Sequence, residues 1–257
     1  MKIVTLIENT ACREDLAAEH GLSLYLETGG QKILFDAGQS GAFAQNADAL
    51  GVNLEEIDLA VLSHGHYDHG GGLLCFLERN QKAKIYVNCH AFEPHYNGRE
   101  KDIGLNRKLL ESDRLVFVED TQEIAPGLTL HTLPLPPMDA AGLTVLENGI
   151  FRPEDFRHEQ YLLAQELGKR ILISGCSHKG ILQIMAHFRP DVLIGGFHFM
   201  KVEEETVLRS AAEVLLQYPT TYYTGHCTGQ SQYAYLKTIL GQRLHSLSTG
   251  RIIELSL

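Results

Sequence analysis

The segment "SHGHYDHGGGL", residues 63–73, places three histidines and an aspartate within six consecutive positions. It follows the apolar run "DLAVL", residues 58–62, which is typical of a buried strand, and it precedes "LLCFLER", which predicts a helix. Proteins that alternate strands and helices place their chemistry at the carboxyl ends of strands. We therefore expect His64, His66, Asp68 and His69 to line a functional site at the mouth of this strand.

The spacing of these four side chains indicates metal binding. Side chains alternate along an extended segment, so His64 and His66 point the same way and can hold one ion, with Gly65 leaving room between them. After the chain turns, Asp68 and His69 offer an oxygen and a nitrogen to a second ion. Imidazole with a carboxylate suits zinc first, and also iron or manganese. The pattern predicts two neighbouring divalent metal ions rather than a chance cluster of surface histidines.

Composition is typical of a globular enzyme. The chain has 257 residues, of which 44% are hydrophobic and 21% charged, and no apolar run approaches the roughly 20 residues of a membrane span. The first apolar run is interrupted by Glu8, too early for the core of a signal peptide, so we expect a cytoplasmic protein. We expect no membrane partner.

Charge and cysteine content exclude two further classes. The formal net charge of −10 disfavours binding to nucleic acid, and no stripe of basic residues stands out to oppose it. The five cysteines are odd in number and scattered, so they predict neither a disulfide framework nor a zinc knuckle. Nothing in the sequence indicates an oligomeric state.

The order of elements predicts an α/β (α+β) fold. Residues 23–28 and 31–36 read as strands around the turn signal Gly29–Gly30. Helices are expected at residues 40–51, 180–187, 203–217 and 231–240, and further short strands fill the centre of the chain. Two sheets with helices outside account for this order, in one domain over residues 1–257. Residues 133–142, "LPLPPMDAAG", read as an irregular loop.

His64, His66, Asp68 and His69 form the motif HxHxDH, and with it the sequence resembles the metallo-β-lactamase fold superfamily. The resemblance extends beyond the motif. "ILFDAG" matches an upstream strand whose aspartate, here Asp36, supports the metal site, and "ISGCSHKG" and "TGHCTG" fall where later ligands are expected. The resemblance implies a four-layer αββα sandwich, with metals along one edge of its two sheets.

A narrower resemblance concerns the segments "GCSHKGI", "GGFH" and "GHCTG" together with the motif. They are similar to the branch named for dihydropterin ribofuranosylaminobenzene 5′-phosphate synthase, which holds many uncharacterised hydrolases. His226 resembles the last histidine of the family and would join Asp68 and His69 at the second ion. Most relatives carry a bridging aspartate after a glycine where this chain has Cys176, so the bridging carboxylate is absent.

The third ligand of the first ion is left open by the sequence. We expect His178, while His158, which opens a predicted strand, competes for the same role. Cys176 is either a thiolate ligand or a small buried side chain. His198 follows an apolar strand and two glycines. We expect it to line the pocket as a proton donor or as a hydrogen-bond partner of the substrate, and a purely structural role is an equally weighted alternative.

The predicted chemistry is hydrolysis. Two cations acidify a bound water and polarise a carbonyl or phosphoryl oxygen, so a metal-activated hydroxide would attack a small ester, lactone, amide or phosphoester. Asp68 would orient the nucleophile, and His198 or Tyr67 would assist the leaving group. The alternatives are the synthase-type reaction of the branch name, an iron-dependent oxidoreductase, and a metal-binding sensor without turnover. A small molecule is the expected substrate, and its identity is not encoded in a recognisable pattern.

Overall fold

The computed structural model describes residues 1–138, 140, 142–166 and 168–255, and its strands form three sheets. The first sheet, in spatial order, consists of β18 (Ile252–Glu254), β1 (Lys2–Ile7), β2 (Ser23–Thr28), β3 (Gln31–Phe35), β4 (Leu59–Val61), β5 (Lys84–Asn88) and β8 (Leu115–Val118). The second consists of β17 (Leu244–Ser246), β16 (Thr221–Thr224), β15 (Val192–Ile194), β14 (Lys169–Ile173), β13 (Gln160–Glu166), β10 (Leu128–Thr132) and β9 (Gln122–Ala125). The third, smaller sheet consists of β12 (Ile150–Pro153), β11 (Leu143–Glu147), β6 (His95–Asn97) and β7 (Lys101–Asp102).

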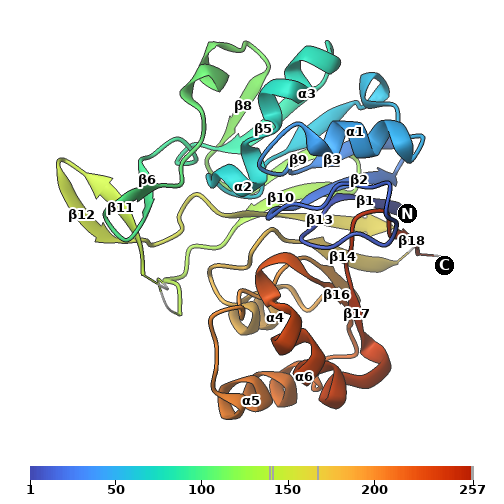
Figure 1. Ribbon diagram of the computed structural model, residues 1–257, viewed down its shortest axis with the longest axis vertical. Coiled ribbons are helices and arrows are strands. Elements are labelled where there is room, and N and C mark those ends of the chain that lie inside the picture. The colour runs from blue at the N-terminus through green and yellow to red at the C-terminus, as the bar shows by residue number, and fades with distance from the viewer. Residues whose placement is uncertain (139, 141, 167, 256–257) are drawn as a thin grey trace.

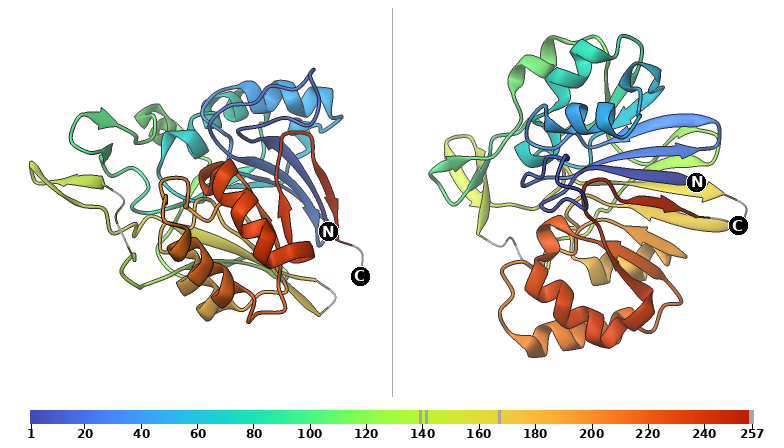
Figure 2. Two further views of the ribbon diagram at one scale, coloured as in Figure 1. Left: turned by 60° about the horizontal axis from the view of Figure 1, so that its bottom comes forward. Right: turned by 45° about the vertical axis from the view of Figure 1, so that its right-hand side comes forward.

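Helices cover the outer faces of the two large sheets, as Figures 1 and 2 show. On the first sheet lie α1 (Ala42–Ala49), α2 (Tyr67–Gly70) and α3 (Leu73–Arg79), and on the second lie α4 (Ile181–Phe188), α5 (Glu205–Leu215) and α6 (Gln230–Leu240). One apolar cluster, including Phe35 and Ile173, fills the space between the sheets, and two others join each sheet to its helices. These layers confirm the predicted αββα sandwich.

Parallel pairing explains where the functional loops meet. Strands β3, β4, β5 and β8 run parallel, as do β14, β15, β16 and β17. Each parallel set exposes its carboxyl ends at one edge of its sheet, so the loops that follow β3, β4, β14, β15 and β16 are brought to that edge. The amino terminus and the end of β18 lie at the other end of the strands, where β1 pairs with β18 (Figure 1).

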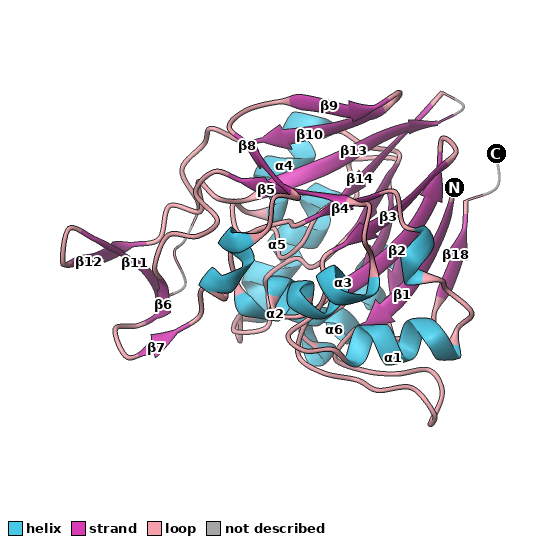
Figure 3. Ribbon diagram, turned by 90° about the horizontal axis from the view of Figure 1, so that it is seen from above, coloured by secondary structure: helices cyan, strands magenta, loops and turns pink. Residues whose placement is uncertain are grey.

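The sequence prediction was correct for the hairpin of β2 and β3 and for α1, α4, α5 and α6 to within a few residues. It missed the third sheet, which projects from one end of the sandwich (Figure 3). Its strands are short and partly exposed; β7 consists of two exposed residues, too few to show an alternating pattern. The loop expected at residues 133–142 includes positions 139 and 141, which lie outside the described residues. None of the described helices is long and apolar enough to cross a membrane.

Candidate metal centre

Two neighbouring groups of ligand atoms lie at this edge of the sandwich. His64 and His66 come from the loop after β4, Asp68 and His69 from α2, His178 from the loop after β14, and His226 from the loop after β16. All six of these residues are at most 9% exposed. The structure therefore brings together the six side chains that the sequence proposed as metal ligands.

The first group contains His64, His66 and His178. Their ring centroids are separated by 4.6 Å between His64 and His66, 4.9 Å between His64 and His178, and 5.0 Å between His66 and His178. The Nε2 atom of each ring is buried and makes no hydrogen bond to any described residue. A buried polar atom without a partner is costly, and a bound cation would satisfy all three. The residues therefore fit a metal ion.

The second group contains Asp68, His69 and His226. The Nε2 atoms of His69 and His226 are 3.2 Å apart, and Asp68 Oδ2 lies 3.3 Å from His226 Nε2 and 3.8 Å from His69 Nε2. Ligands on a tetrahedral zinc ion are separated by about 3.3 Å, given bonds of about 2.0–2.1 Å. The three atoms are thus spaced as ligands of one ion would be.

Asp36 fixes the proton positions of two of these histidines. Its Oδ2 accepts a hydrogen bond from His69 Nδ1 at 2.6 Å and from the Ser63 hydroxyl at 2.7 Å. Because that hydroxyl donates to Asp36, its lone pair accepts from His64 Nδ1 at 2.8 Å. In their neutral form both rings carry the proton on Nδ1 and present Nε2 as the lone pair that binds a metal. Asp36 therefore supports the site, as the resemblance implied.

Asn9 orients the ring of His226 and Glu8 holds its backbone, and neither residue was predicted from the sequence. Asn9 Oδ1 accepts from His226 Nδ1 at 2.9 Å and from the Gly21 N–H at 3.3 Å, so the oxygen is the atom that faces the ring. The buried Glu8 carboxylate accepts the backbone N–H of His226. Both residues lie at the end of β1, more than 200 positions away in the chain, which is why no local pattern could reveal them.

His178 is held by contacts on both sides. Its ring stacks on Phe156 with centroids 4.3 Å apart and an interplanar angle of 8°. Its backbone N–H donates to Glu159 Oε1 at 2.7 Å, and the next N–H, of Lys179, donates to Glu159 Oε2 at 3.0 Å. The buried carboxylate therefore fixes the loop that carries His178.

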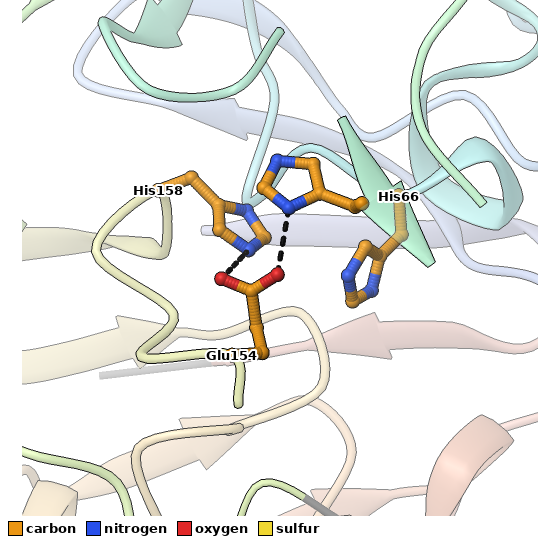
Figure 4. Close-up of side chains that lie close together, drawn as sticks. His66, Glu154 and His158 are labelled. Atoms are coloured by element: carbon orange, nitrogen blue, oxygen red, sulfur yellow. Dashed lines mark hydrogen bonds and ion pairs between the residues drawn. The ribbon is translucent and has the colours of Figure 1, made fainter. Parts of the chain in front are cut away.

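His158 has a different role from His178. Its Nδ1 accepts the backbone N–H of Gly65 at 2.8 Å, so in the neutral ring the proton resides on Nε2, which faces Glu154 Oε1 at 3.7 Å (Figure 4). A protonated Nε2 has no lone pair for a metal. His158 thus holds the loop between His64 and His66, and His178 is the better candidate for the first ion.

Glu154 also binds His95. His95 lies on β6 and is fully buried, and its Nδ1 donates to Glu154 Oε2 at 2.7 Å. Figure 4 shows the carboxylate between two imidazoles, with His66 beside them. The ligand atoms of His66, His95, Glu154 and His158 all lie within 4.8 Å of one another, but the carboxylate already accepts from His95. This cluster links the third sheet to the metal-binding loop.

His20 is another residue near the site that the sequence did not single out. Its Nε2 lies 3.4 Å from Asp68 Oδ2, and its ring centroid lies 4.6 Å from that of His226. The side chain is 43% exposed, so it lies at the entrance of the second group. It has no sequence signal, because the apolar residues around it form no regular pattern.

The metal-free site has strongly perturbed proton affinities. Burial lowers the pKa of His64 and His178 well below the usual value, and it lowers that of His66 to about 3 despite the opposing charge of Asp68. Burial also acts to lower the pKa of His69, but the charges of Asp36 and Asp68 outweigh it and raise that pKa to about 9. The first group therefore presents neutral imidazoles at neutral pH, whereas binding at the second releases a proton from His69.

Unusual backbone conformations concentrate at the site. Asp36, Phe156, Ser177, His198 and His226 have φ values between 46° and 60°, which non-glycine residues adopt rarely. Each such conformation costs about 1–3 kcal/mol and persists only where the surrounding structure enforces it. Their clustering at the sheet edge indicates that the loops are shaped by the placement of these side chains.

Two glycines permit the loops to approach one another. A Cβ atom at Gly65 would lie 2.2 Å from the carbonyl oxygen of Ala91, and one at Gly175 would lie 2.2 Å from Ser63 Oγ. No side chain fits at either position without displacing its neighbours. Gly65 is therefore required by the packing of residue 91 against the loop between His64 and His66.

A pocket of about 800 Å³ opens beside the first group. Its walls come mainly from α4, α5 and the segment after β15, and its lining includes His178, His198 and Met138. His198 is half-buried, and its ring centroid lies 4.3 Å from that of His178. Most of the lining is apolar, including Phe197, Phe199 and Val207. Tyr67, the other candidate for assisting the leaving group, accepts from Lys101 Nζ at 3.2 Å.

Comparisons with known proteins agree with this geometry. Residues 17–150 match the family model described as the metallo-beta-lactamase superfamily. The chain is 28% identical to the 7,8-dihydropterin-6-methyl-4-(beta-D-ribofuranosyl)-aminobenzene-5'-phosphate synthase of Methanocaldococcus jannaschii, over 99% of this chain and 96% of that protein.

Two solved structures extend the comparison. The crystal structure of Tm1679, a metal-dependent hydrolase of the beta-lactamase superfamily, superposes with a TM-score of 0.85 at 28% identity, covering 100% of this chain and 99% of the other. Zn(2+)-bound PqqB from Methylobacterium extorquens has a TM-score of 0.62 at 13% identity, covering 99% of this chain and 100% of the other, and shares the fold.

Proposed function

Since the chain belongs to the metallo-beta-lactamase superfamily, we propose that it is a metal-dependent hydrolase that acts on a small ester, lactone or phosphoester. The observation that carries the proposal is the pair of adjacent buried groups, in which His64, His66 and His178 present lone pairs without partners and Asp68 lies beside His69 and His226. The resemblance of the whole chain to Tm1679, described as a metal-dependent hydrolase, supports the same class.

The donor set suits two divalent ions, with zinc as the first choice. His64, His66 and His178 would hold one, and Asp68, His69 and His226 the other. Two such ions, when bound, supply a water of lowered pKa and polarise the oxygen of the bond to be cleaved. Asp36, through His69 and through Ser63 and His64, keeps the ligand lone pairs directed at the ions.

The chain's own residues also orient the substrate. Asp68 has a second oxygen that would not be needed as a ligand and could accept a proton from a water that lies between the two groups. His198 lies at the junction of the metal centre and the apolar pocket, where it can hydrogen-bond the leaving group. The lining by Phe197, Phe199 and Val207 favours a substrate with an apolar or aromatic body next to the cleaved bond.

A synthase-type reaction is the second candidate. It is favoured by the similarity to the archaeal synthase over nearly the full length of both chains. The mostly apolar lining of the same pocket suits a substrate with aromatic rings, such as the pterin and aminobenzene groups in the name of that relative. The two candidates share the metal centre and differ in whether water or a second organic molecule receives the transferred group.

The experiment is a panel of chromogenic aryl esters, lactones and phosphoesters, each with a short polar and a longer apolar substituent, tested with protein loaded with zinc or manganese. We expect turnover that is highest for apolar substituents and that falls at least about 100-fold in Asp68→Asn, because removing even a supporting group of a metal site costs roughly 10–100-fold.

The matched control is Asp58→Asn, a partly exposed aspartate paired with Lys82 away from the centre, which should keep full activity. Absence of turnover with the whole panel in fully loaded wild-type protein would overturn the hydrolase proposal. Equal rates in Asp68→Asn and wild type would overturn the assignment of the centre.

A further inference from the structure

We infer that His20 is a catalytic hydrogen-bond donor beside the second group of ligands, where it stabilises the negative oxygen that forms on the substrate during hydrolysis. The inference rests on the proposed function and adds a residue to which that proposal gives no role. His20 lies in the loop between β1 and β2. Its ring is close to two candidate ligands, so the position of its proton decides whether it binds an ion or donates to a substrate.

His20 lies on the solvent side of two buried ligands. Its Nε2 atom is 3.4 Å from Asp68 Oδ2, and its ring centroid is 4.6 Å from that of His226. The side chain of His20 is 43% exposed, whereas that of Asp68 is 12% exposed and that of His226 is 1% exposed. The His20 ring is therefore the part of this cluster that is most accessible to a molecule entering from solvent.

Asn9 fixes the proton of His20 as well as that of His226. Its oxygen accepts from His226 Nδ1 at 2.9 Å and from the Gly21 N–H at 3.3 Å. Its amide nitrogen then donates to the carbonyl oxygen of His226 at 3.3 Å and faces His20 Nδ1 at 3.5 Å. Because an amide nitrogen donates and does not accept, His20 Nδ1 is the acceptor, and the neutral ring carries its proton on Nε2.

The two histidines beside Asn9 therefore have opposite roles. The neutral His226 ring presents a lone pair at Nε2, whereas His20 presents an N–H at the same atom. A protonated nitrogen has no lone pair for a metal, so His20 is not a ligand although its ligand atom lies within 4.8 Å of those of Asp68 and His226. The 3.4 Å separation from Asp68 Oδ2 is longer than a typical N–H···O bond, which leaves the N–H available to a substrate oxygen.

The backbone around His20 is fixed although its side chain is exposed. The Gly21 N–H donates to Asn9 Oδ1 and the Leu22 N–H donates to the Asp68 carbonyl oxygen, both at 3.3 Å. A Cβ atom at Gly21 would lie 2.5 Å from the same Asp68 oxygen. The loop thus packs directly against the residue whose carboxylate faces the ring. Donors that are held in place before the reaction are the ones that stabilise a developing charge effectively.

A neutral N–H at this position suits an oxygen that gains negative charge. When water adds to an ester carbonyl, one electron pair of the C=O bond moves to the oxygen, and the proton that the water loses goes to Asp68. His20 Nε2–H donates a hydrogen bond to the negative oxygen and keeps its own proton. The electron pair then returns to carbon, and the leaving group departs with the proton from Asp68. In a phosphoester the donor serves a phosphoryl oxygen in the same way.

The first measurement is metal binding, because it separates a donor from a ligand. Metal-free wild type, His20→Ala and His20→Gln are titrated with zinc against a chromophoric chelator. We expect each protein to bind two ions with affinities within about threefold of wild type, since His20 supplies no lone pair to either ion. Loss of one ion, or a larger loss of affinity, in His20→Ala would show that the ring is a ligand and would overturn the inference.

The second measurement is the binding of benzylphosphonate to the zinc-loaded proteins, followed by isothermal titration calorimetry. This probe has an aromatic body and a tetrahedral group of negative oxygens. A hydrogen bond to a charged group contributes about 10–100-fold to an affinity, so we expect a loss of at least about 10-fold in His20→Ala. His20→Gln, whose amide nitrogen can take the place of Nε2, should recover most of it. The control His187→Ala, at an exposed position of α4, should bind as wild type does.

The third measurement is turnover of the ester that wild type cleaves fastest. Removing one donor to a developing oxyanion costs about 100–1,000-fold in kcat. We expect a loss of this size in His20→Ala with KM nearly unchanged, because the charge is absent from the bound ester, and partial recovery in His20→Gln. Unchanged probe affinity or unchanged kcat in His20→Ala, or a His20→Gln variant as impaired as His20→Ala, overturns the donor role.

Failure of this inference is distinguishable from failure of the proposed function. If zinc-loaded wild type binds benzylphosphonate but cleaves no compound of the panel, the hydrolase proposal fails, and the probe affinities of the variants still decide the role of His20 as a donor. If zinc-loaded wild type does not bind the probe, the inference fails and the hydrolase proposal is judged by turnover alone. Wild-type protein that binds no ion refutes both.

Discussion

Asp36→Asn tests how the site controls the protons of its ligands. The Asp36 side chain is fully buried and accepts from Ser63 N at 2.7 Å, Ser63 Oγ at 2.7 Å and His69 Nδ1 at 2.6 Å. Asparagine keeps one acceptor oxygen and replaces the other by an NH₂ group. Whichever way the amide points, one donor then faces another donor, and the favoured escape is for His69 to move its proton from Nδ1 to Nε2.

The expected magnitude follows from that change. A proton on Nε2 removes the lone pair that would bind the second ion, and losing a supporting group of this kind lowers metal affinity by about 10–100-fold, or about 1.4–2.7 kcal/mol. Hydrogen bonds to a charged group contribute about 1.5–3 kcal/mol, so the metal-free variant should also lose about 2 kcal/mol of unfolding free energy. The first ion should also be affected, because in that orientation the amide NH₂ faces the Ser63 hydroxyl as well, and a hydroxyl that accepts from the amide no longer holds the proton of His64 on Nδ1.

The assay is zinc titration against a competing chromophoric chelator, with urea unfolding of the metal-free protein measured in parallel. Asp58→Asn serves as the control, because that carboxylate accepts the Lys32 N–H at 3.0 Å just before β4 and so lies at the opposite end of this strand from the histidines. The reasoning is refuted if Asp36→Asn folds and binds both zinc ions within about threefold of wild type, a difference of about 0.7 kcal/mol.

Two further predictions concern packing and pH. Gly65→Ala should lose about 1–3 kcal/mol of unfolding free energy in urea, since its Cβ would lie 2.2 Å from the Ala91 carbonyl oxygen; an unchanged midpoint would contradict the tight approach. In metal-free protein, burial lowers the pKa of His158 well below its usual value and that of His66 to about 3, so below about pH 6.5 the unfolded chain binds protons that the folded chain does not. The free energy of unfolding should therefore fall by about 1.4 kcal/mol per pH unit for each such ring as pH drops from 6.5 towards 3. His69 acts in the opposite direction: its pKa is raised to about 9, so its contribution to stability is complete below pH 6.5 and is lost as pH rises through 9. Melting temperatures that stay flat from pH 7 to 5 would contradict the loss of stability expected from His158 and His66.

Local patterns predicted the strands and helices around the site and the clustering of its first candidate ligands, whereas the αββα arrangement was implied by the resemblance to a known family. The apolar run of β4 followed by the HxHxDH motif predicted a strand mouth with ligands, and the Gly29–Gly30 turn predicted the hairpin of β2 and β3. These features depend on residues close in sequence, whose alternation or spacing reports directly on the local backbone. His178 and His226 were found by the same means, as polar residues after apolar strands.

The tertiary structure decided how these side chains are completed. Asn9 and Glu8 meet His226 because β1 pairs in the first sheet while β16 pairs in the second, and the sandwich brings their ends together. His95 lies on β6 of the third sheet and Glu154 directly follows β12, so their contact depends on where that sheet lies against the sandwich. Hydrogen-bond direction, which separates His158 from His178, and the position of Cys176 between two groups depend on contacts between residues far apart in the chain. A sequence records which donors are available, and only long-range strand pairing determines which of them face the same point in space.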